Sequence, residues 1–121
     1  MRERKAIILF GHGSRDPLWR RPIEAVAARL VAQQPALLVA CAYLELDQPD
    51  LPGALAQLAV RGATEVTVVP MFLGAGKHAR EDLPALVQAL SRAHPEVRLN
   101  LQQPVGEDPR VLDLLAKIAL E

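Results

Sequence analysis

Apolar residues are arranged along the chain in two alternating patterns, short continuous runs and longer segments with helical spacing. The runs lack polar alternation, which is typical of strands buried on both faces of a parallel sheet. In the longer segments apolar residues recur three or four positions apart, which favours amphipathic helices. We predict strands at residues 6–9, 36–44, 65–69 and 97–101, and helices at residues 18–34, 50–61, 79–94 and 108–120.

Local signals support the ends of two of these helices. Pro22 falls in the first turn of the first helix, where a missing N–H costs little. Asp50 can cap the second helix, and Gly62 can end it. The pattern is therefore βαβαβαβα.

This alternation predicts one α/β domain over residues 1–121, with a four-stranded parallel sheet and helices on both faces. The expected arrangement is flavodoxin-like, with strand order 2-1-3-4. Strands 1 and 3 are then neighbours, and the topological switch lies between them. Ligands of open α/β sheets bind beyond the carboxyl ends of the strands at such a switch.

Composition narrows the class of function. The 121 residues include 14 basic and 14 acidic side chains, so no strong net field attracts nucleic acid or an anionic membrane. Aromatic residues make up 3%, too few for a platform on which single-stranded bases could stack. The single Cys41 excludes an internal disulfide, and no apolar segment is long enough to span a membrane. We expect a cytoplasmic protein.

Polar candidates follow three of the predicted strands at the same edge of the sheet. His12 follows strand 1, Glu45 follows strand 2, and His78 lies in the loop after strand 3. Two imidazoles and a carboxylate suit a divalent transition metal, and three protein ligands leave positions open. Taken singly, each histidine could instead be a hydrogen-bonded loop residue, and Glu45 a solvated strand end. His94 is predicted to be a surface histidine at a helix end.

Basic residues gather on the loops that carry the two histidines. They are Arg15, Arg20, Arg21, Lys77 and Arg80, with Asp16, Glu81 and Asp82 between them. Either some of these cations meet carboxylates or phosphates of a ligand, or they form a mixed solvated surface. The apolar segment Met71, Phe72 and Leu73 either folds into the core, as favoured for Phe72, or lines a pocket wall. Cys41 is expected to be an inert packed thiol.

Several familiar motifs are incomplete. Residues 74–77 resemble the end of a phosphate-binding P-loop, but His78 stands where that motif needs Ser or Thr. The segment around His12 lacks the third glycine of a dinucleotide fingerprint, and Ser14 is not in a Gly-x-Ser-x-Gly elbow. Histidine phosphatases have arginine before the nucleophilic histidine, whereas this chain has Gly11. A phosphoryl-transfer enzyme is therefore disfavoured.

Three motifs together resemble the class II sirohydrochlorin chelatases, in particular the small single-domain cobaltochelatases and the related sirohydrochlorin ferrochelatases. They are Gly-His-Gly-Ser-Arg-Asp at 11–16, Tyr-Leu-Glu-Leu at 43–46, and Val-Pro-Met-Phe-Leu at 69–73 leading to Gly-Lys-His-Ala-Arg-Glu-Asp-Leu-Pro at 76–84. The resemblance implies a chelatase-like half domain that inserts a divalent metal into sirohydrochlorin, on the route to cobalamin or sirohaem. It implies His12 and His78 as active-site histidines and Glu45 as their acidic partner. Larger relatives contain two such halves, which implies that this chain forms a homodimer.

On this reading the metal, Co²⁺, Fe²⁺ or Ni²⁺, is a substrate, and no bound organic cofactor is expected. The candidates for holding the tetrapyrrole are Ser14, Arg15, Met71, Phe72, Leu73, Lys77 and Arg80. Which histidine acts as the base and which as the main ligand stays open. The alternative is a metal- or tetrapyrrole-binding carrier of the same fold without turnover.

Overall fold

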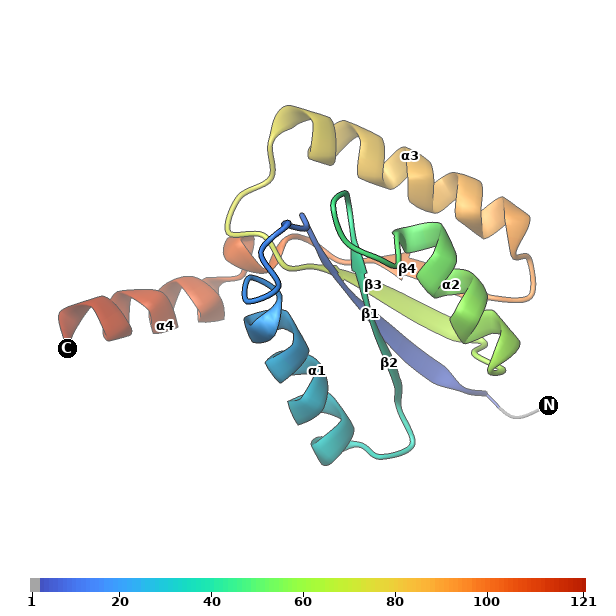
Figure 1. The fold of residues 1–121 in the computed structure, drawn as a ribbon, viewed down its shortest axis with the longest axis horizontal. Helices are drawn as coiled ribbons and strands as arrows, with labels where there is room; N and C mark the ends of the chain where they lie inside the picture. The colour runs from blue at the N-terminus through green and yellow to red at the C-terminus, as the bar shows by residue number, and fades with distance from the viewer. Residues whose placement is uncertain (1–2) are drawn as a thin grey trace.

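The computed structural model describes residues 3–121 as four strands, four helices and one short 3₁₀ helix (Figure 1). In chain order the elements are β1 (Lys5–Gly11), α1 (Arg21–Gln33), β2 (Leu38–Tyr43), α2 (Leu51–Val60), β3 (Glu65–Pro70), α3 (Lys77–Ala93), β4 (Arg98–Leu101), η1 (Val105–Glu107) and α4 (Pro109–Leu120). The strands form one parallel sheet in the order β2-β1-β3-β4. The predicted alternation and strand order are confirmed.

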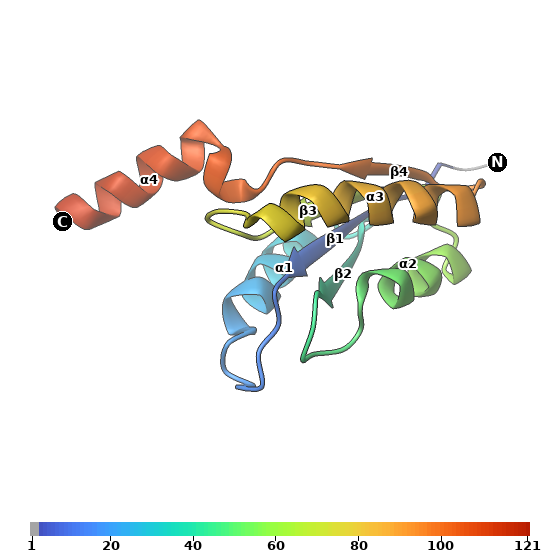
Figure 2. The same cartoon turned by 90° about the horizontal axis from the view of Figure 1, so that it is seen from above.

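Helices lie on both faces of the sheet, with α1 on one face and α2 and α3 on the other (Figures 1 and 2). Because successive side chains of a strand point to opposite faces, β1 contributes to both layers. Its residues Ile8 and Phe10 pack into the core formed with α2 and α3, whereas Leu9 packs with Ile23 of α1. The central strand is therefore buried from both sides.

Helix α4 does not take part in either layer. It follows η1 at the end of β4 and extends away from the sheet, and none of its residues is buried (Figure 2). Its cap is well formed, because the carboxylate of Asp108 accepts the backbone N–H of Arg110 at 2.8 Å. Hydrogen bonds from Arg110 lower the pKa of Asp108 to about 2. Neither α4 nor any other helix within residues 3–121 is long and apolar enough to cross a lipid bilayer.

Two predicted helix starts were wrong. The first helix begins at Arg21 rather than residue 18, because the Asp16 carboxylate accepts the N–H of Leu18 at 2.9 Å and forms a turn before the helix. The third helix begins at Lys77 rather than residue 79, directly after Gly76. Lys77 and His78, predicted to lie in a loop, are therefore in the first turn of α3.

The predicted signals at Pro22, Asp50 and Gly62 are confirmed. Pro22 lies in the first turn of α1. The side chain of Asp50 accepts the N–H of Gly53 at 2.9 Å and caps α2. Gly62 has a φ of +92° just after that helix, the left-handed conformation that glycine adopts without strain.

Truncating Leu55 of α2 tests how far the stability of the fold depends on the helices that cover this face of the sheet. Leu55 is fully buried, so we expect Leu55→Ala to lower the free energy of unfolding by about 2–5 kcal/mol. Val60 lies on the same helix and is 89% exposed, so Val60→Ala should change it by less than about 0.5 kcal/mol. Urea denaturation of both variants measures the difference, and equal effects would contradict this assignment of the core.

Candidate active site

The site forms where the central strand ends between its two neighbours. Beyond the last paired residues, the N–H of Met71 donates to the carbonyl of Phe10 at 2.8 Å. On the other side, the N–H of Leu44 donates to the carbonyl of Gly11 at 2.9 Å. The loops that follow β1, β2 and β3 therefore leave the sheet together, at the switch point between β1 and β3.

His12 is the first residue after β1, and its side chain is exposed. One face of its imidazole packs against Phe72, with the ring centroids 4.5 Å apart and the planes inclined by 34°. Phe72 is 4% exposed and packs in turn edge-on against Phe10, with centroids 5.9 Å apart. Among the described residues, no side chain or backbone group is hydrogen-bonded to the imidazole. Its ring nitrogens are thus available to a metal ion or a proton.

Glu45 lies beside His12 through the backbone. Its N–H donates to the carbonyl of His12 at 3.0 Å, which extends the pairing of β1 with β2 past the strand ends. The Glu45 side chain is exposed, and its carboxylate makes no hydrogen bond or ion pair with any residue in the range 3–121. The Glu45 carboxylate is therefore free to bind a ligand from solvent.

His78 is brought to the same edge by α3 rather than by a loop. It is exposed in the first turn of that helix, next to Lys77. The first intrahelical hydrogen bond runs from the N–H of Arg80 to the carbonyl of Gly76 at 3.0 Å. The amides before Arg80 have no carbonyl to pair with inside the helix, and this favours an anion near the turn.

The three predicted ligands are not drawn into one cluster. Within residues 3–121, no three His, Cys, Asp or Glu side chains are placed to hold a metal ion together. His12 and Glu45 are neighbours through the backbone, while His78 comes from a separate element. A single chain therefore offers an open set of ligands rather than a closed metal cage.

The basic residues on the loops around the histidines fall into two groups. Arg15, Arg21, Lys77 and Arg80 are exposed, although the Arg80 guanidinium also donates to the carbonyl of Ala75 at 3.4 Å. Arg20 is instead engaged internally, with its guanidinium 3.1 Å from Asp47. The exposed cations can meet anionic groups of a ligand, whereas Arg20 serves the fold.

The apolar segment after β3 also divides by residue. Phe72 is in the core, as expected, and Met71 is half-buried beside it, whereas Leu73 is 70% exposed. Phe72 also lines an apolar pocket of about 280 Å³ between α3 and η1, with Leu83 and Arg80 among its other walls. Phe72 therefore both supports His12 and forms part of the wall of this pocket.

The buried phenol of Tyr43 and the half-buried thiol of Cys41 are protonated at neutral pH. Burial and the neighbouring Cys41 thiol raise the pKa of Tyr43 to about 12. Burial also raises the pKa of Cys41, with a further contribution from Glu24. The half-buried position of Cys41 agrees with its interpretation as a packed thiol.

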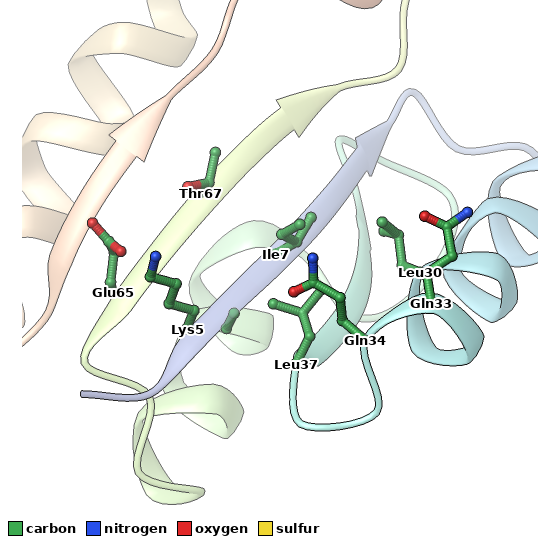
Figure 3. A pocket seen from close by; sticks show the side chains of 9 residues that line it. Lys5, Ile7, Leu30, Gln33, Gln34, Leu37, Glu65 and Thr67 are labelled. Atoms are coloured by element: carbon green, nitrogen blue, oxygen red, sulfur yellow. The ribbon is translucent and has the colours of Figure 1, made fainter. Parts of the chain in front are cut away.

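A second pocket, of about 290 Å³, lies at the opposite edge of the sheet (Figure 3). Its walls include Lys5 and Ile7 of β1 and Glu65 and Thr67 of β3, at the amino ends of the two strands. It is thus separated from the histidines by the length of the strands.

Two residues with clear structural roles at the site were not predicted from the sequence. Asp47 hydrogen-bonds across to the His12 loop, and the N–H of Gly106 donates to the carbonyl of Phe72 at 2.9 Å. Both are contacts between segments far apart in the chain, for which a single sequence has no local signal. The family resemblance did not include either position.

Comparison with known proteins gives a consistent result. The family model CbiX matches residues 6–121. The sirohydrochlorin cobaltochelatase of Methanococcoides burtonii is 27% identical over an alignment of 129 residues. The alignment covers 100% of this chain and 98% of that protein.

Solved structures match the fold over nearly the whole chain. A putative cobalamin biosynthesis CbiX protein from Marinobacter aquaeolei VT8 has a TM-score of 0.81 and 35% identity, covering 95% of this chain and 93% of that one. The sirohydrochlorin chelatase SirB from Bacillus subtilis subspecies spizizenii, in complex with cobalt, has a TM-score of 0.78 and 27% identity. That match covers 94% of this chain but 49% of SirB.

The close contact between the loops at Gly13 predicts a site that cannot tolerate a side chain. Gly13 has a φ of +98°, and a Cβ there would lie 1.7 Å from the carbonyl oxygen of Glu45. We expect Gly13→Ala to lower the free energy of unfolding by about 2 kcal/mol or more, because the two loops must separate. At Gly74 nothing lies within 4 Å of an added Cβ, so Gly74→Ala should change it by less than about 0.5 kcal/mol. Thermal or urea unfolding of the two variants measures these changes. A Gly13→Ala variant as stable as the wild type would contradict the close contact between the loops.

Proposed function

The chain belongs to the CbiX family, and we propose that it inserts a divalent metal ion, Co²⁺ or Fe²⁺, into sirohydrochlorin. The observation that carries this proposal is the placement of His12. It lies exposed at the end of the central strand, is supported by Phe72 on one face, and has Glu45 beside it. The cobaltochelatase names of the relatives and the cobalt bound to SirB support the same reaction.

The histidines supply what metal insertion requires. One divalent ion replaces two pyrrole N–H protons of the macrocycle, so two protons must leave as the metal enters. A neutral imidazole accepts a proton near neutral pH and is also a good ligand for Co²⁺ or Fe²⁺. We assign these tasks to His12 and His78 together, with Glu45 as a further ligand or as the group that takes the proton onward.

The surroundings of the histidines suit a flat macrocycle with anionic substituents. Arg15, Lys77 and Arg80 are exposed and can bind its carboxylates by charge-assisted hydrogen bonds. Exposed Leu73 and half-buried Met71 offer apolar contact to the ring, and Ser14 lies at the margin of the same loop as His12. These residues would bind the tetrapyrrole, while the ligand set stays open enough to release the metal.

Multiple-turnover insertion tests this function. Co²⁺, Fe²⁺ and Ni²⁺ are each supplied without oxygen to sirohydrochlorin and the protein, and absorbance follows the metallated product. We expect His12→Ala and His78→Ala each to lower kcat/KM by about a hundredfold or more, because each removes a proton acceptor and a ligand. The ranking of the metals then distinguishes a cobalt from an iron chelatase.

His94 provides the matched control for this experiment. It caps the opposite end of α3 from His78, with its Nδ1 3.5 Å from Glu96, so His94→Ala should leave kcat/KM within about twofold of wild type. If the wild-type chain binds metal or tetrapyrrole with no rate above the uncatalysed background, the protein is a carrier.

We also propose that the chain acts as a homodimer whose contact includes α4. The apolar side chains Leu112, Leu114, Leu115, Ile118 and Leu120 of this helix are all exposed. A helix of 12 residues is marginal in water on its own, so its apolar face needs a partner. Arg110, Asp113, Lys117 and Glu121 share the opposite face and sum to no net charge, so they raise no electrostatic barrier to self-association.

A second copy is favoured as that partner by two further observations. Other exposed apolar residues, Leu18, Trp19, Leu44, Leu46 and Leu73, lie on the loops at the carboxyl edge of the sheet, from which α4 also departs. In addition, this chain matches 49% of SirB, which leaves length in that protein for a second half. Two copies would bring two such edges together around the substrate.

The mass in solution tests the dimer. By light scattering after size-exclusion chromatography, the wild type should have the mass of two chains. Leu115→Arg should give the mass of one, because it puts a charge into the apolar face of α4. Val60 is 89% exposed on α2, so Val60→Arg should leave the dimer intact. A wild type that is monomeric, or a Leu115→Arg variant that still dimerises, would contradict the proposal.

A further inference from the structure

The carboxylate of Asp47 lies between the loop that follows β1 and the loop that follows β2. Its Oδ2 accepts the backbone N–H of Ser14 at 2.9 Å, and its Oδ1 accepts a guanidinium N–H of Arg20 at 3.1 Å. The side chain is only 9% exposed. Both oxygens are thus engaged, and the charge is balanced by Arg20, whose own side chain is 38% exposed.

A sharp turn directs this side chain away from its neighbour Glu45. Leu46 has a φ of +67°, which is uncommon for a residue with a Cβ, and the N–H of Asp47 donates to the carbonyl of Glu45 at 2.8 Å. Two carboxylates two residues apart consequently have different surroundings. Glu45 is exposed, whereas Asp47 is turned into the contact between the loops.

The Asp47 contacts complete the attachment of the His12 loop to the Glu45 loop. The backbone bond from Glu45 to His12 holds one side of the histidine, and the bond from Ser14 to Asp47 holds the chain two residues later. Arg20 lies at the far end of the same loop, just before α1, so Asp47 also holds that end. Of the hydrogen bonds between these two loops in residues 3–121, only the backbone pairing at the start of the loop would remain without Asp47.

We propose that Asp47 is a positioning residue for metal insertion, fixing the loop of residues 12–20 to the loop of residues 44–47. It thereby keeps the imidazole of His12 and the carboxylate of Glu45 in one relative position before the substrate arrives. Its own oxygens do not contact the substrate. The catalytic part of this inference rests on the proposed function, whereas the structural part does not.

The kinetic test compares Asp47→Ala with a conservative variant. We expect Asp47→Ala to lower kcat for metal insertion by about tenfold to a hundredfold, because the reacting groups lose their fixed relation. The KM for sirohydrochlorin should stay within about twofold, since of the proposed tetrapyrrole-binding residues only Ser14 and Arg15 lie on the loop that loses its attachment. Asp47→Asn retains an oxygen for the Ser14 N–H and should recover most of kcat.

Asp50→Ala is the matched control from the same connection. It removes the cap of α2, a hydrogen bond of the same length from Gly53, without touching the His12 loop. It should lower the unfolding temperature about as much as Asp47→Ala does, while leaving kcat within about twofold of wild type. An unchanged kcat in Asp47→Ala, or an equal loss of kcat in Asp50→Ala, would overturn the proposal.

Amide hydrogen exchange separates this inference from the proposed function, because it needs no turnover. In Asp47→Ala, the amides of Ser14 and Glu45 should exchange at least about tenfold faster than in wild type, and the strand amides of β1 should not change. Unchanged exchange at both amides would overturn the structural role. If the wild-type chain inserts no metal, the proposed function fails, and these exchange rates still decide whether Asp47 holds the two loops together.

Discussion

The parallel pairing of β1 with both of its neighbours is the constraint on which the rest of the molecule depends. Phe10 is paired with Ala42 of β2 on one side and with Pro70 of β3 on the other. The pairing continues past the strand ends, where Met71, Leu44 and Glu45 donate to carbonyls of residues 10–12. The three loops that hold the candidate site are thus attached to one buried strand. Backbone hydrogen bonds fix where each loop begins, and side-chain contacts such as those of Asp47 hold the loops together further along the chain.

The features predicted from the sequence are those that depend on local pattern. Continuous apolar runs identified the strands, and helical spacing identified the connections, from which the strand order followed. The errors lie at helix starts, where a side chain or a glycine changes the local backbone conformation. The spacing of Leu18 fits a helix, but the Asp16 side chain captures its N–H in a turn. The Asp47 contact could not be predicted at all, because it joins residues 33 positions apart.

Helix α4 shows a second limit of sequence patterns. Its amphipathic spacing correctly predicts a helix, since the apolar residues fall on one side and the charged residues on the other. That pattern identifies a face that must be covered but contains no information on what covers it. The alternation of strands and helices predicted helices on both faces of the sheet but did not say on which face, or whether, the last helix would pack. The helix extends away from the sheet, and its apolar face lies outside the core.

The two carboxylates after β2 show how one short segment can both hold the loops rigidly and offer a ligand for a metal ion that is passed on to the substrate. Because Arg20 balances the charge of Asp47, that carboxylate can be buried between the loops without attracting a metal ion. Glu45 has no such partner among residues 3–121 and lies exposed to solvent, next to His12. A transfer site must bind a metal weakly enough to release it, and separate ligands on a rigid frame meet that need better than a closed cluster. Rigidity of the loops and openness of the ligand set are therefore compatible, because different side chains provide them.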